Sequence, residues 1–203
     1  MQIIKDDIQR TIILKSKDIF LTNGFQKASM RDISASSGVS LGNIYNYFAS
    51  KDEVFLSVVC PAMIALYKML DKHHGKQGVE IIALKDNDYF SVVLDEYFTL
   101  IKENKDLLWL LLILSDGSRL KNFKNNYVIR SNSLVRTWFS DMKTKYPHIN
   151  TDFSDSFLSL HTFWMFEMIE QIIKNSYSEK ETIKTLSDYI TFEIQGWKQL
   201  TGI

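Results

Sequence analysis

Residues 29–51 read SMRDISASSGVSLGNIYNYFASK. Two short amphipathic segments are joined there by a tight turn at Ser37, Gly38 and Val39. Glycine suits the positive φ that such a turn requires, and Ser29 and Ser40 are both suited to cap the helix that follows them. This layout is that of a helix-turn-helix, whose second helix enters the major groove of DNA. The stretch therefore predicts a DNA-binding regulator and not an enzyme.

Helical segments are predicted on both sides of this stretch. A first helix covers residues 7–23, with Gly24 as its C-terminal stop. A fourth helix starts after Ser50 and is expected to kink near Pro61, because proline removes a backbone donor. A loop is expected at residues 73–78. The apolar spacing predicts five further helices, over residues 89–103, 106–116, 123–146, 152–175 and 179–200.

The composition agrees with an all-α fold. Only 8 Gly and 2 Pro occur among the 203 residues, so few positions interrupt a helix. We expect about nine helices in two domains. The first, at residues 1–50, is a three-helix helix-turn-helix domain that binds DNA, and the second, at residues 51–203, is a larger helical domain.

Charge and apolar patterning narrow the class of protein. The net charge is zero, which argues against non-specific binding to nucleic acid, because such binding needs a broad positive surface. Residues 1–51 alone carry a charge of +3. Cys60 is the single cysteine, so no internal disulfide forms. The longest apolar run, residues 107–114, is far shorter than the roughly 20 residues that span a bilayer, and the N-terminus lacks the apolar segment of a signal peptide. We expect a cytoplasmic protein with no membrane partner.

The third helix, predicted over residues 41–48, divides into two faces at about 100° per residue. Leu41, Ile44, Tyr45 and Phe48 fall on one side, where Ile44 and Phe48 are expected to enter the core and Tyr45 to pack against it. The other side carries Gly42, Asn43, Asn46 and Tyr47. Asparagine bonds an adenine edge bidentately, and a tyrosine hydroxyl bonds phosphate. The competing interpretation is an ordinary solvated face.

Several short segments agree in order and spacing with one family. They are residues 24–25, 29–33, 37–40, 42–48 and 50–53. Together they resemble the N-terminal signature of the TetR family of transcriptional regulators, over about the first quarter of the chain. The resemblance implies a homodimer that binds a double-stranded, near-palindromic operator. It also implies release from DNA by a small-molecule effector, in the manner of a repressor.

The resemblance also implies roles for individual residues. Ser29 and Ser40 would cap helices and contact phosphate, and Arg31 would contact a base or a phosphate. Gly42, Asn43 and Asn46 would lie against base edges. Tyr47 and Lys51 would contact the DNA backbone. Leu41 departs from the family pattern, which commonly has a basic or polar residue there. Arg31 and Lys51 have an alternative interpretation as ordinary surface charges.

The C-terminal domain is rich in aromatic residues, most of which an ordinary core would explain. The resemblance implies a ligand pocket among them, for which the candidates are Trp109, Tyr127, Trp138 and His161. It also implies dimerisation through the last two helices. Two apolar stripes suit that interface, Phe157, Leu160, Trp164 and Met168 on one helix and Ile183, Leu186, Ile190 and Ile194 on the other. Burial within one chain is the alternative.

Catalytic motifs are absent from the sequence, and neither a cofactor nor a metal is expected. His73 and His74 would point about 100° apart on a helix and make a poor metal pair. Two alternative functions stay open. One is a DNA-binding regulator without a small-molecule ligand, which a solid C-terminal core would favour. The other is a small helical carrier or enzyme, which would bind ligand without binding DNA.

Overall fold

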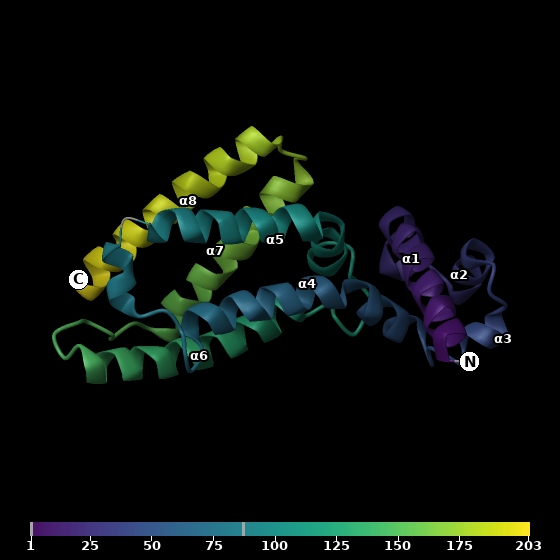
Figure 1. Ribbon diagram of the computed structural model, residues 1–203, viewed down its shortest axis with the longest axis horizontal. Helices are drawn as coiled ribbons and strands as arrows, with labels where there is room; N and C mark the ends of the chain where they lie inside the picture. The colour runs from purple at the N-terminus through teal and green to yellow at the C-terminus, as the bar shows by residue number, and fades with distance from the viewer. Residues whose placement is uncertain (1, 87) are drawn as a thin grey trace. The chain divides into compact units, whose positions relative to one another are not determined.

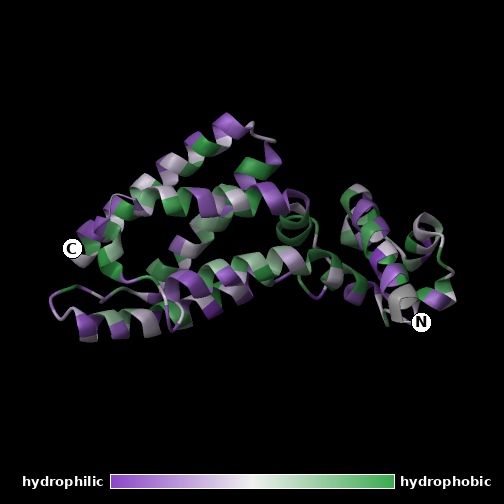
Figure 2. Cartoon of the chain, viewed as in Figure 1, coloured by the Kyte–Doolittle hydropathy of each residue, from purple (hydrophilic) through white to green (hydrophobic). Residues whose placement is uncertain are grey.

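The computed structural model describes residues 2–86 and 88–203, and every regular element within these ranges is helical (Figure 1). The elements are α1 (Gln2–Lys27), α2 (Met30–Ser37), α3 (Leu41–Ile44), α4 (Lys51–His74), the short 3-10 helix η1 (Ile81–Lys85), α5 (Tyr89–Leu112), α6 (Phe123–Lys145), α7 (Asp155–Lys174) and α8 (Glu179–Thr201). The predicted all-α fold is confirmed. Figure 2 shows hydrophobic and hydrophilic residues alternating along most of these helices, as amphipathic helices require.

Two helix breaks occur where the sequence predicts them. Gly24 has φ 67° and ψ 170°, so regular helix stops there and resumes for a final turn to Lys27. Asn104, with φ −119° and ψ 15°, separates the two parts of α5 that the sequence predicted as two helices. Helix α4 runs through Pro61 to His74, and the kink expected at Pro61 stays a prediction. The helix η1 was not predicted.

The chain divides into two compact units whose limits differ from the predicted boundary at residue 50. The first unit contains the residues up to Ile64 together with Asn104–Phe123, and the second contains Ala65–Glu103 and Lys124–Ile203. The boundary falls inside α4 rather than at its start, because the first half of α4 belongs to the core of the first unit. The segment 104–123 could not be assigned from sequence spacing, since its contacts are with residues far away in the chain.

The first unit has a filled aromatic core. The Phe55 ring lies edge-on to Phe20 and Phe25, with ring centres 5.0 and 5.1 Å away. Segment 104–123 is held to the N-terminal helices by backbone bonds, because the Phe25 N–H donates to the Leu114 carbonyl at 3.0 Å. The Arg119 N–H likewise donates to Asp52 Oδ1 at 2.7 Å. These contacts make the two stretches of the first unit one folded body.

The second unit packs η1 against α6, α7 and the loop between them. Its buried cluster contains Ile81, Phe139, Met142, Ile149, Phe153 and Leu158, with Trp138 and Trp197 at its edge. Arg136 braces this arrangement by an ion pair with Asp155 at 2.7 Å. The unit therefore has an extensive apolar interior that gathers side chains from all of its helices.

Helix α4 is long and apolar enough, by length and composition alone, to cross a membrane, a test that core helices also pass. Its apolar side chains include Val54, Val59, Ala62 and Leu66, all of them fully buried in the protein. This burial favours the interpretation of α4 as a core helix.

Candidate nucleic-acid interface and ligand pocket

Local hydrogen bonds build the second helix and the turn after it. Ser29 and Asp32 form a reciprocal capping box, in which the Asp32 N–H donates to Ser29 Oγ and the Ser29 N–H donates to Asp32 Oδ2 at 2.9 Å. The Ser29 hydroxyl also donates to Asp32 Oδ2 at 2.7 Å, and this bond, together with the one from the Ser29 N–H, lowers the pKa of the Asp32 carboxyl group. Gly38 ends α2 with φ 68°, a conformation that L side chains rarely adopt. Ser34 Oγ then donates to the Val39 carbonyl at 2.7 Å, which fixes the turn.

The third helix is shorter than predicted. α3 covers Leu41–Ile44, with Ser40 as its N-cap, and the chain continues as a tighter turn. The Tyr47 N–H donates to the Ile44 carbonyl at 2.9 Å, a bond between residues three apart. Ile44 and Phe48 are buried as predicted. The expectation that Tyr45 packs against the core is wrong, because its side chain is 50% exposed.

The predicted DNA-facing residues lie at the surface of the first unit. Gly42 and Asn46 are exposed, and Asn43 and Tyr47 are half-buried. The Asn46 Nδ2 donates to Asn43 Oδ1 at 3.3 Å, so the two amides are held as a pair. A Cβ atom added at Gly42 would meet nothing within 4 Å, which leaves this position open to a close approach. The arrangement offers two amides and phenol groups on one open surface.

The two basic residues predicted to contact DNA differ in their surroundings. Arg31, in the first turn of α2, is exposed. Lys51 instead donates from Nζ to the carbonyls of Phe25 and Ala28, both at 2.7 Å, and lies 4.2 Å from the centre of the Phe25 ring. Burial lowers the pKa of the Lys51 ammonium group. Two of its three N–H donors therefore hold the connection between α1 and α2, a role that the sequence did not indicate.

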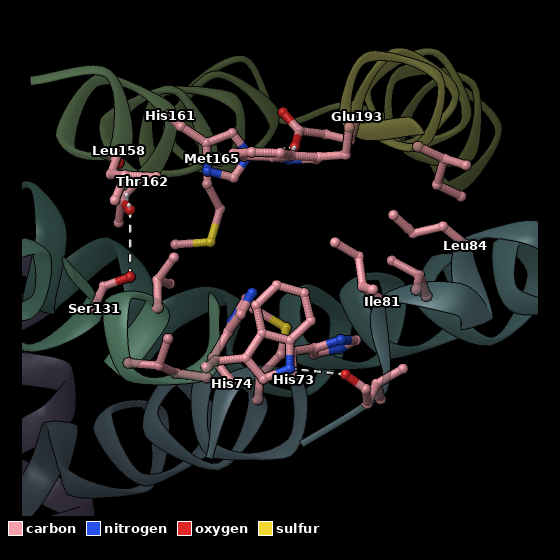
Figure 3. Close-up of a pocket in the computed structure, with 18 of the residues that line it drawn as sticks. His73, His74, Ile81, Leu84, Ser131, Leu158, His161, Thr162, Met165 and Glu193 are labelled. Carbon is pink, nitrogen blue, oxygen red and sulfur yellow. Dashed lines mark hydrogen bonds and ion pairs between the residues drawn. The ribbon is translucent and has the colours of Figure 1, made fainter. Parts of the chain in front are cut away.

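A cavity of about 180 Å³ lies inside the second unit, lined by residues from α4 to α8 (Figure 3). Of the predicted pocket residues, Tyr127, Trp138 and His161 line it, whereas Trp109 belongs to the first unit and does not. Tyr127 is buried and its hydroxyl donates to the Leu66 carbonyl at 3.1 Å. The Trp138 indole N–H donates to the Val79 carbonyl at 2.9 Å. These hydrogen bonds satisfy the Tyr127 hydroxyl and the Trp138 indole N–H, the polar groups of two otherwise apolar side chains.

Several polar residues of the pocket were not predicted. His161 Nε2 bonds Glu193 Oε2, and the Trp197 indole N–H donates to the same oxygen at 3.0 Å. His74, which was expected to lie in a loop, lines the cavity. Burial, with His73 and His161 nearby, lowers the pKa of His74 to about 3, so its ring is neutral at physiological pH. The signal that could have found Glu193 is a lone acid on an otherwise apolar face of α8.

The predicted dimer stripes divide between the surface and the interior. Phe157, Leu160, Trp164 and Ile183 are exposed, and Phe163 and Phe192, which were not predicted, join them. We call these six residues the α7–α8 apolar face. The other predicted residues, Met168, Leu186, Ile190 and Ile194, are buried within the second unit. Periodicity alone cannot tell which apolar side of a helix faces its own chain.

The α7–α8 apolar face is large for an isolated surface. Leu160 is 68% exposed and Phe192 is 66% exposed. Trp164 joins the two helices, because its ring lies 5.1 Å from Phe192 and 4.8 Å from Tyr189. Trp164 and Phe192 thus form an exposed aromatic pair across the two helices, and exposed apolar patches mark interaction sites.

Known proteins resemble this chain in two ways. The family of bacterial regulatory proteins described as the tetR family matches residues 12–58. The HTH-type transcriptional regulator YfiR of Bacillus subtilis is 33% identical over 75 residues, a match that covers 37% of each chain.

Solved structures extend the likeness of the fold to most of the chain. The regulator FadR from Bacillus subtilis, in complex with stearoyl-CoA, has a TM-score of 0.61 at 14% identity over 89% of this chain and 96% of that one. MexZ, a key repressor responsible for antibiotic resistance in Pseudomonas aeruginosa, has a TM-score of 0.64 at 13% identity over 96% of this chain and 98% of that one. Residues 12–58 of the chain therefore carry the helix-turn-helix region of the TetR family of bacterial transcriptional regulators.

Proposed function

We propose that this protein is a dimeric transcriptional repressor that binds a palindromic operator and leaves it when a small molecule fills the cavity of the second unit. The observation that carries the proposal is the helix-turn-helix, with its capping box at Ser29, its αL turn at Gly38 and its exposed amide pair. Regulation and not catalysis is the function of the family whose helix-turn-helix region the chain carries. We place the protein in the cytoplasm, where such a regulator meets DNA.

The amide pair supplies the proposed sequence readout. Asn43 and Asn46 present a donor and an acceptor beyond their shared hydrogen bond, which is the pattern that an adenine edge complements. Gly42 lets the backbone approach the duplex. Arg31, Tyr47 and the hydroxyls of Ser29 and Ser40 supply phosphate contacts, which position the protein without reading sequence. The exposed Tyr45 joins this set.

Lys51 has a different role in this proposal. Its two short bonds to the Phe25 and Ala28 carbonyls hold the α1–α2 connection in place. One N–H donor stays available for a phosphate group. Residues around α3 contain no Lys or Arg, so affinity depends strongly on two chains binding one DNA molecule together.

Dimerisation is proposed through the α7–α8 apolar face. Aromatic anchors such as Trp164 and Phe192 dominate the energetics of protein interfaces. A second copy of the chain would bury the same residues by twofold symmetry. The dimer would set the two recognition helices about 34–36 Å apart, one turn of DNA.

The cavity favours a ligand-responsive regulator over one without a ligand, since a solid core would have favoured the latter. A ligand weakens operator binding only to the extent that it prefers the non-binding state. Two proteins of similar fold support this proposal, because FadR was solved in complex with stearoyl-CoA and MexZ is described as a repressor.

A band-shift titration tests the proposal, with promoter DNA of the protein's own gene or an adjacent gene. We expect nanomolar binding to a palindrome at moderate salt. Asn43→Ala should relax base preference, and Tyr47→Phe should weaken binding about equally on all sequences. Binding that ignores sequence, or no binding at all, would rule out the repressor.

A further inference from the structure

Two buried polar atoms of the cavity lining have no hydrogen-bond partner among the described residues: Asn132 Oδ1, an acceptor, and His74 Nδ1, which donates or accepts according to the tautomer of the neutral ring. Asn132 Nδ2 donates to Ser159 Oγ at 2.8 Å and lies 3.5 Å from the Asp155 carbonyl, which can only accept, so the amide orientation is settled. Its Oδ1 is buried and has no partner among the residues that the structure describes. A buried acceptor of this kind requires a donor, because leaving it unbonded is costly.

Glu193 adds a second acceptor to the same cavity. Its Oε2 accepts from the Trp197 indole N–H at 3.0 Å and lies within hydrogen-bond distance of His161 Nε2, to which the same indole N–H also donates at 3.2 Å. Within the described chain, Oε1 takes no hydrogen bond. Figure 3 shows Glu193 and His161 on one side of the open space, with His73 and His74 on the opposite side. A ligand in this space can therefore donate to Glu193.

The charges around the cavity favour a cation. The described lining residues include neither Lys nor Arg. Of the carboxylates in the lining, Glu80 is ion-paired with Lys145, whereas the ion-pair partner of Glu193 is the imidazole of His161, which carries a charge only when protonated. His74 is neutral because of its burial. The wall therefore offers a buried anion no permanently charged partner, whereas a protonated nitrogen would find Glu193 and aromatic faces such as Trp138 and Trp197.

We propose that the effector is a small apolar, aromatic-bodied molecule with one protonated nitrogen, and that the nitrogen binds Glu193. This inference rests on the proposal that the cavity is the effector site. The volume of about 180 Å³ suits one ring with a short chain, since cavities of ~150 Å³ hold benzene. The proposed ligand differs in charge from stearoyl-CoA, which FadR binds.

Calorimetric titration of the full chain without DNA tests the ligand class separately from operator binding. The probes are phenylbutylamine, phenylbutanol and phenylbutyrate, which share one body and differ in charge at neutral pH, together with stearoyl-CoA. We expect phenylbutylamine to bind tightest. Glu193→Gln should weaken it about tenfold or more, because a charge-assisted bond becomes a neutral one.

Two further variants make the result specific. Glu103→Gln removes an exposed carboxylate from α5, outside the cavity lining, and should leave the affinity unchanged. Asn132→Leu removes the second acceptor and should weaken the amine without reversing its preference over phenylbutyrate. Tighter binding of phenylbutyrate or stearoyl-CoA than of the amine overturns the proposal, as does no amine binding at all. Equal amine affinity in Glu193→Gln and in the unaltered chain also overturns it. All of these results are independent of whether operator DNA is bound.

Discussion

The two units of this protein use their interiors differently. The first unit closes its core around three phenylalanine rings and leaves polar side chains on its surface. The second unit keeps a cavity of about 180 Å³ in its interior, with histidine and glutamate side chains in the wall. A filled core fixes the geometry of a reading surface, whereas a hollow core provides space whose occupation can change a conformational equilibrium.

The largest expected effect comes from opening the filled core. Phe55→Ala should destabilise the protein by about 3–5 kcal/mol, because the ring is buried against Phe20 and Phe25 and the site cannot collapse fully. Urea unfolding monitored by circular dichroism measures this. Leu56→Ala is the matched control, since Leu56 is the exposed neighbour. A loss below about 1 kcal/mol in Phe55→Ala would show that this core is not tightly packed.

A matched pair of valines compares the two interiors directly. Val59 is fully buried in the first unit, and Val135 lines the cavity of the second. Val59→Leu should cost about 1–3 kcal/mol by overpacking, whereas Val135→Leu should cost less than about 0.5 kcal/mol because the cavity admits the added carbon. Equal losses of unfolding free energy in the two variants would mean that the cavity cannot accommodate the added carbon.

A variant of Lys51 tests the structural role of this residue separately from its proposed contact with DNA. Lys51→Met keeps the length of the side chain but leaves the Phe25 and Ala28 carbonyls without their donor, so we expect a loss of about 1–2 kcal/mol without DNA present. Lys27→Met, at an exposed lysine near the end of α1, serves as the control. If thermal unfolding of Lys51→Met matches that of the control, Lys51 does not hold the α1–α2 connection.

His74 gives the second unit a pH dependence. Its pKa is lowered to about 3 in the fold from 6.5, so between these values the unfolded chain binds a proton that the folded chain does not. The contribution of the His74 side chain to the free energy of unfolding has its full value above pH 6.5. As the pH falls below 6.5 this contribution is lost, by at most about 1.4 kcal/mol per pH unit. His74→Leu should flatten the slope of unfolding free energy against pH, and His148→Leu, at an exposed histidine, should not. A slope unaffected by His74→Leu would contradict a buried neutral ring.

The sequence predicts best what short-range bonds decide. The caps at Ser29 and Ser40, the turn at Gly38 and the break at Gly24 join residues within five positions of each other, and all were predicted. The bonds of Lys51 cross 23 and 26 positions and were not. Helical phase placed Ile44 and Phe48 correctly but misplaced Tyr45, because the chain leaves regular α-helix geometry after Ile44.

The pocket and the interface depend on how whole helices pack. Tyr127, Trp138 and His161 were predicted to line the cavity, but Glu193 and His74 were missed because the cavity they line is formed by helices far apart in the sequence. The stripe on α8 was predicted as interface, and Leu186, Ile190 and Ile194 are instead buried within the unit. Both sides of such a helix carry apolar residues, so tertiary packing and not periodicity decides which side is exposed.

The central claim is that the surface around α3 reads DNA and needs a second chain to do so. The most direct measurement is a band-shift titration that compares two proteins on two DNA molecules. The proteins are the unaltered chain and the double variant Leu160→Asp/Phe192→Asp, which places charges on the α7–α8 apolar face. The DNA molecules are a whole palindrome and a palindrome with one scrambled half-site. We expect two chains bound per palindrome, with binding weakened at least about tenfold by either the double variant or the scrambled half-site. If one chain binds as tightly to the scrambled site, or the double variant binds as tightly as the unaltered protein, the claim is contradicted.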